Sequence, residues 1–351
     1  MLLLLVLAAL TISARAAEVP RELQEALPEG AEEWMVEDVS GPEGFSRGIA
    51  AIAQGVLEEG KDILRSRLRG AASVLLVAVF CGAVESFSGG GRAAAFLPMA
   101  GGLAVTMLTV GSLDELIGLG SRTIGELDTL SKVLLPTLAA ATAASGSVTS
   151  ATMQQVTTVF LVSLLISLIN VFLMPLCCLY IGVLAAGSCL QEARLAAIAE
   201  GMKKVITWTL TTALLLFTVY LSVARVITGA ADAAAVKVTK AAISGVVPVV
   251  GGIIAEASET VLTGAGLLKN TVGVFGMLAI LAGCALPFLH LGVQYLLYKL
   301  TAFLSAAVGA PWLCKLIDGL GGAFGLVLGM TGSCAVLLLV SAFSFVAAVT
   351  P

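Results

Sequence analysis

Charged residues are scarce in this chain. Only 12% of its 351 residues are Asp, Glu, Lys or Arg, whereas an average soluble domain has about 25%. The net charge is −4, and no basic stripe with interleaved aromatic residues is present, which argues against a nucleic-acid-binding protein. Because 58% of the residues are hydrophobic and the apolar runs are long, the composition indicates an integral membrane protein.

Residues that carry catalytic chemistry are also rare. His290 is the only histidine, so the two-histidine motif of zinc proteases is excluded. A serine–histidine dyad would need His290 to meet a serine such as Ser188, which has no nucleophile-elbow context. The run Gly264–Lys269 fits neither a phosphate loop nor a dinucleotide fingerprint, and no strand precedes it. We therefore predict a protein that is not an enzyme and has no cofactor.

The cysteines do not form the pattern of a disulfide framework. All seven lie in or beside apolar runs, where a thiol behaves as a small hydrophobic group: Cys81, Cys177, Cys178, Cys189, Cys284, Cys314 and Cys334. The adjacent pair Cys177 and Cys178 lacks the two-residue gap that zinc sites prefer. No disulfide framework and no metal cluster are expected.

The amino-terminal part has two sections. Residues 1–17 have a short apolar core followed by small residues, as in a secretory signal peptide, although an uncleaved anchor is an alternative. Residues 18–70 form an acidic extracytoplasmic leader, either weakly ordered or a docking surface, that ends in an amphipathic helix. That helix carries Lys61, Arg65, Arg67 and Arg69. Basic clusters usually stay cytoplasmic, so an exported helix would lie against headgroups on the outer face.

Residues 71–351 read as an all-α, polytopic helical membrane domain. The expected spans are Ala71–Phe87, Ala93–Leu113, Val156–Leu190, Val205–Ile227, Thr271–Val293, Tyr295–Ala310 and Leu320–Val349. Asp114–Lys132 is amphipathic, and the short segment Val133–Val148 is expected to break at Pro136. Val156–Leu190 is too long for one crossing, so Pro175 is expected to divide or kink it.

The segment Ser244–Gly276 is unusual for a membrane span. Pro248 removes a backbone donor, and Gly251 and Gly252 permit angles that other residues resist. A helical pattern then places Glu256 and Glu259 on one polar flank, and Lys269 and Asn270 end the segment. We interpret it as a broken, re-entrant element, and these seven residues as a candidate pore lining or subunit contact. The other reading of the two acids is a polar face at the membrane interface.

The proline positions suggest an internal repeat, with halves 121–232 and 233–351. Pro136 and Pro175 are separated by the same interval as Pro248 and Pro287. Paired interrupted segments are typical of transporter repeats, so a permease-like transporter of small solutes is one hypothesis. Identity between the halves is otherwise poor.

A glycine row occurs near the carboxyl end. Gly321, Gly325 and Gly329 recur at four-residue spacing, which lets another helix approach closely. We expect packing within the chain or, alternatively, self-association in a homo-oligomer.

The central segment also resembles a known family. The runs PVVGG from Pro248, SETVL from Ser258, GAG from Gly264, LKN from Leu268 and GVFG from Gly273 are similar to the signature of the stage III sporulation protein AE family of endospore-forming bacteria. The resemblance implies a non-catalytic, multi-pass component of the bacterial cytoplasmic membrane, on the mother-cell side around the forespore. It also implies a channel complex shared with other stage III sporulation membrane proteins and a forespore-side partner.

Overall fold

The chain folds into an elongated helical bundle. The computed structural model describes residues 19–34, 41–88, 92–144, 148–246, 251–308 and 311–347. The helices are α2 (Arg21–Glu25), α3 (Ala31–Trp34), α4 (Gly41–Ser88), α5 (Arg92–Ala144), α6 (Val148–Leu168), α7 (Met174–Leu190), α8 (Ala193–Val246), α9 (Gly251–Ala307) and α10 (Pro311–Ala347). A π-helical turn, Ile169–Leu173, joins α6 to α7. The expected signal peptide lies outside the described residues.

Within the described residues, six helical stretches are long and apolar enough to cross a membrane. Their lengths are 28 to 49 residues, whereas the hydrocarbon core needs about 20. This confirms the expected class, an all-α polytopic membrane protein. Because every stretch exceeds the minimum length, parts of the bundle must tilt or extend beyond the hydrocarbon.

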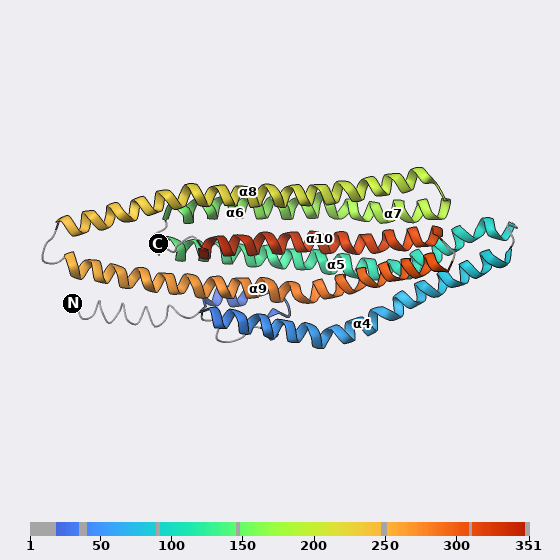
Figure 1. Cartoon of the computed structure of the whole chain (residues 1–351), viewed down its shortest axis with the longest axis horizontal. Helices are drawn as coiled ribbons and strands as arrows, with labels where there is room; N and C mark the ends of the chain where they lie inside the picture. Colours follow the sequence, from blue (N-terminus) through green and yellow to red (C-terminus); the bar gives the residue numbers. More distant parts are fainter. Residues whose placement is uncertain are drawn as a thin grey trace.

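The helices run nearly along one axis, with α5, α9 and α10 in the middle (Figure 1). On one side lie α6, α7 and α8, and on the other lies α4. Burial agrees with this arrangement: 61% of the apolar window of α9 and of α10 is buried, against 17% for α8. The hairpin α9–α10 is therefore the centre of the fold.

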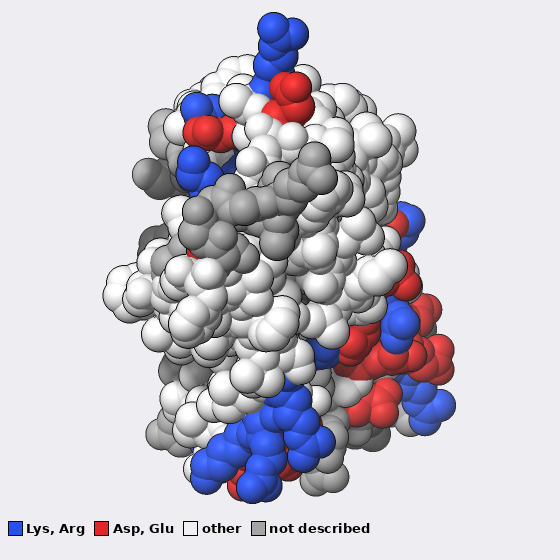
Figure 2. Space-filling view, turned by 90° about the vertical axis from the view of Figure 1, so that its right-hand side faces the viewer, with Lys and Arg blue, Asp and Glu red and all other residues white. Residues whose placement is uncertain are grey.

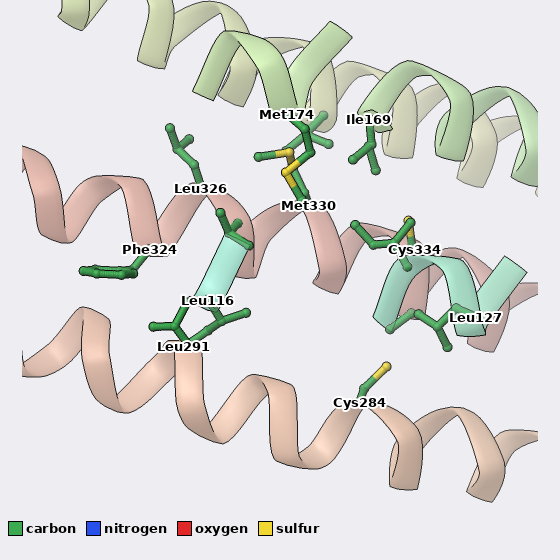
Figure 3. Close-up of a cluster of buried hydrophobic side chains, with 14 of the residues drawn as sticks. Leu116, Leu127, Ile169, Met174, Cys284, Leu291, Phe324, Leu326, Met330 and Cys334 are labelled. Atoms are coloured by element: carbon green, nitrogen blue, oxygen red, sulfur yellow. The ribbon is translucent and has the colours of Figure 1, made fainter. Parts of the chain in front are cut away.

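Apolar side chains fill the space between these helices (Figure 3). Leu116 and Leu127 of α5 and Leu291 of α9 are fully buried. From α10, Met330 points toward Met174 at the start of α7. Burial of each such side chain contributes about 1.5–3 kcal/mol, so this cluster holds the helices of the bundle together.

Two expected breaks are absent. Helix α5 continues through Pro98 and Pro136, and α9 continues through Pro287. The prediction that the chain breaks at Pro136 is therefore wrong. So is the division into separate spans at 271–293 and 295–310, because α9 covers both. Membrane helices tolerate such prolines where neighbouring groups satisfy the freed backbone. Next to Pro136, Thr137 Oγ1 donates to the Val133 carbonyl at 2.7 Å.

Pro175 has a visible effect on the long segment 156–190. It lies at the start of α7, directly after the π-helical turn Ile169–Leu173. The proline ring would clash with the carbonyl four residues earlier in a regular α-helix. The wider π turn makes room for it. The proline thus changes the helix locally, while Gln155–Leu190 stays one continuous helical stretch, so the predicted division near Pro175 is not seen.

Two expectations remain predictions. The break at Pro248 falls between α8 and α9, outside the described residues, so the re-entrant reading of this segment is not tested. The internal repeat of 121–232 and 233–351 is likewise a hypothesis. The leader was expected to end at residue 70, which lies inside the continuous helix α4.

Candidate functional site

The predicted central segment enters the bundle as the first part of α9. Gly251 and Gly252 form the first turn of this helix, and Glu256 and Glu259 follow within it. Pro248 and the side chains of both glutamates lie outside the described residues. Their role as a pore lining or subunit contact stays a prediction.

Lys269 and Asn270 lie where the central segment meets the core. The Lys269 side chain is 2% exposed, and the neighbouring Val272 is fully buried, while Asn270 is exposed. Among the described residues Lys269 forms no ion pair. A buried ammonium group is costly, so Lys269 is the more unusual of the two candidate residues here whose side chains the structure describes.

The glycine row packs mainly against α9. A Cβ atom added at Gly321 would lie 3.0 Å from Tyr298 Cβ, and one at Gly325 would lie 3.0 Å from Tyr295 Cε2. At Gly329 nothing lies within 4 Å. Two of the three glycines thus permit close approach of α9 and α10, while the third faces open space.

A set of polar residues that the sequence analysis did not assemble connects helices across the bundle. We call it the polar layer, and it consists of Arg67, Thr109, Glu115, Tyr180, His290, Gln294, Tyr298, Lys299 and Asp318. These residues come from α4, α5, α7, α9 and α10. Their contacts join helices that are far apart in the sequence.

At one edge of the layer, α4 is joined to α5 and α9. Arg67 Nη1 and Nη2 donate to the two carboxylate oxygens of Glu115 at 2.9 and 2.6 Å, a bidentate geometry that is strong and directional. Nη2 also lies 3.4 Å from Nδ1 of His290. His290 therefore faces the Arg67 guanidinium group, which donates hydrogen bonds and does not act as a nucleophile. We interpret this contact as a connection between α4 and α9.

The buried centre of the layer is on α9. Tyr298, 1% exposed, donates from its hydroxyl to Thr109 Oγ1 at 3.0 Å, and Thr109 in turn donates to the Val105 carbonyl. The Tyr298 ring meets the ring of Phe324 edge to face at 5.1 Å. One helical turn earlier, Gln294 is 1% exposed, and its Oε1 has no hydrogen-bond partner in the described part of the chain.

The opposite edge joins α7 and α9 to α10. The Tyr180 hydroxyl donates to the Gly319 carbonyl at 2.8 Å. Lys299 Nζ lies 2.5 Å from Asp318 Oδ1 and 5.7 Å from the centre of the Tyr295 ring. Such contacts between helices specify one arrangement of neighbours in an otherwise apolar bundle. In the sequence, residues such as Thr109, Tyr180 and Gln294 stand out only as isolated polar positions in apolar runs.

We predict that Gln294→Leu leaves the thermal midpoint of the purified protein unchanged or raises it. A buried carbonyl oxygen without a partner costs about 1–3 kcal/mol, and leucine removes that cost at similar volume. Thermal unfolding monitored by size-exclusion chromatography measures this. Asn270→Leu, at an exposed position of the same helix, is the control. A clear fall of the midpoint for Gln294→Leu alone would show that Oε1 has a partner.

A family model and a curated relative match most of the chain. The family model described as Stage III sporulation protein AE matches residues 35–349. The Stage III sporulation protein AE of Bacillus subtilis (strain 168) is 22% identical over 297 residues, which cover 83% of this chain and 73% of the relative. No solved structure matches. The family match extends from the end of α3 to the end of α10, and this chain belongs to the stage III sporulation protein AE family.

Proposed function

We propose that the protein is a structural, non-catalytic membrane component of the channel complex between mother cell and forespore. Family membership and six long apolar helices support a sporulation role in a membrane. The observation that carries the structural role is the polar layer. Its described contacts connect helices to one another through hydrogen bonds and ion pairs.

The packing of the core favours this role over a permease-like transporter. A transporter that rocks two halves needs a polar site near the membrane midplane, between its repeats. Here apolar side chains pack around the polar layer between α5, α7, α9 and α10 (Figure 3), and the described polar contacts join these helices directly to one another. A pathway formed between this chain and neighbouring subunits fits that packing better than one through the middle of a single chain.

The partners under this proposal are other stage III sporulation membrane proteins, a forespore-side protein and further copies of the chain. The outer helix α8 presents an apolar surface to lipid or to such partners, with Trp208 70% and Leu216 63% exposed. The location that follows is the mother-cell membrane around the forespore.

The candidate acids give this proposal a test in the spore-forming host. A strain lacking the gene is complemented with the wild-type chain or with the double variant Glu256→Leu and Glu259→Leu. We expect the variant to reach the membrane at wild-type level but to restore far fewer heat-resistant spores, because two acids that contact water or a subunit are lost. A matched double variant, Glu58→Leu and Asp62→Leu on α4, serves as control.

One result would overturn the proposal, and another would remove the two acids from it. Full spore formation in the strain without the gene would remove the sporulation role. Full restoration by the Glu256 and Glu259 double variant would leave the role in place but remove these acids from it.

A further inference from the structure

Three cations on α4 form an exposed row. Lys61, Arg65 and Arg69 recur at four-residue spacing and therefore lie on one face of the helix. All three are exposed. None of them forms an ion pair among the described residues, although Asp62 is exposed on the same helix.

Arg67, in the same stretch, behaves differently. It lies on the opposite side of α4, its side chain is only 12% exposed, and Glu115 binds it. The fold thus uses one cation of this cluster to join helices and leaves the other three facing outward. Figure 2 shows Lys and Arg gathered in a patch at the lower edge of the molecule, the side on which Figure 1 draws α4.

The face that carries the cations becomes apolar toward the end of the helix. Leu76 and Phe80 are each 68% exposed, and Phe87 is 92% exposed. In the other direction the same face carries the exposed polar residues Gln54 and Glu58, with the exposed Leu57 beside them. The cations therefore lie where a polar surface changes to an apolar one, which is the position of a bilayer interface.

The neighbouring part of α5 fits the same boundary. Its residues 93–113 run back along the end of α4, with Phe96 65% and Met107 72% exposed, and its first acids, Asp114 and Glu115, follow directly. Each arm of this hairpin has close to the roughly 20 apolar residues that cross a hydrocarbon core. The hairpin extends beyond the neighbouring turns at that end of the bundle (Figure 1).

We propose that Lys61, Arg65 and Arg69 bind the phosphate groups of anionic phospholipids where α4 enters the bilayer. Three cations on one face complement negatively charged headgroups, and the apolar residues beyond them contact the acyl chains. An acidic protein segment also complements the cations, but it does not account for the apolar continuation of the same face. The row thereby fixes the depth of the α4–α5 hairpin in the membrane.

The test compares lipid binding by the full-length chain and two triple variants. Purified protein in neutral detergent is titrated with dioleoyl phosphatidylglycerol or dioleoyl phosphatidylcholine, and bound lipid is counted by native mass spectrometry. The row variant is Lys61→Gln, Arg65→Gln and Arg69→Gln. The control is Arg122→Gln, Lys132→Gln and Lys204→Gln, which removes the same charge from exposed cations that each pair with a carboxylate.

We expect the wild type and the control to prefer phosphatidylglycerol. In the row variant, binding of phosphatidylglycerol relative to phosphatidylcholine should fall at least about tenfold, because each cation near an anionic surface adds to the affinity. Unchanged preference in the row variant, or equal loss in both variants, would overturn the proposal. So would a wild type that prefers neither lipid but binds, through the row, a synthetic acidic peptide with the sequence of residues 18–34. Circular dichroism and elution volume establish that both variants are folded.

Discussion

Replacing Gly321 with leucine is expected to lower the thermal midpoint of the protein by several degrees. A Cβ atom at this position already lies 3.0 Å from Tyr298 Cβ and 3.7 Å from the Lys299 backbone nitrogen. The neighbouring atoms are close to the α9 backbone and cannot move aside as the end of a flexible side chain would. Overpacking of this kind costs about 1–3 kcal/mol, and here we expect the upper part of that range.

Gly329→Leu is the matched control, because it makes the same change on the same helix where nothing lies within 4 Å. Leucine favours a helix over glycine by about 1 kcal/mol, so this variant should keep or raise the midpoint. Both midpoints come from thermal unfolding in detergent. Equal behaviour of the two variants would show that the spacing of α9 and α10 does not depend on Gly321.

Arg67→Met is expected to destabilise the bundle by about 1–2 kcal/mol through loss of its bidentate contact with Glu115. We expect no larger loss of stability, because the Glu115 side chain is 60% exposed and water can solvate it after the change. The comparison is Arg65→Met, a neighbouring exposed arginine, whose effect should stay within about 0.5 kcal/mol.

A double-mutant cycle separates the pair from the loss of apolar contacts. It combines Arg67→Met with Glu115→Gln and compares the sum of the single effects with the double variant. We expect the double variant to lose less than that sum. Strict additivity would mean that the ion pair contributes nothing to the position of α4.

The helical membrane class follows from the sequence because long apolar runs have few other solutions in a bilayer. Element boundaries follow less well, since a proline has opposite effects in different surroundings. At Pro136 a threonine hydroxyl donates to the adjacent carbonyl and the helix continues. At Pro175 the chain adopts a π turn instead. A proline alone therefore does not show whether the chain continues as an α-helix or takes a π turn.

The polar layer illustrates a second limit. Arg67 and His290 are 223 positions apart, and Tyr298 and Thr109 are 189 apart, so no short motif links them. Spacing did place Gly321 and Gly325 on one face, but their partners, Tyr298 and Tyr295, emerge only from the fold. Glu259 lies in one of the runs that resemble the family and Glu256 lies just before it, and the side-chain contacts of both remain a prediction.

Co-purification from sporulating cells tests the proposed role in a complex most directly. The chain, carrying an affinity tag and expressed from its own promoter, is purified from gently solubilised membranes, and the recovered proteins are quantified by mass spectrometry. The account predicts that other stage III sporulation membrane proteins are recovered in a fixed ratio to the tagged chain. It also predicts that Gly321→Leu lowers their recovery while Gly329→Leu does not. Recovery of the tagged chain with no stage III protein above the untagged control would contradict it.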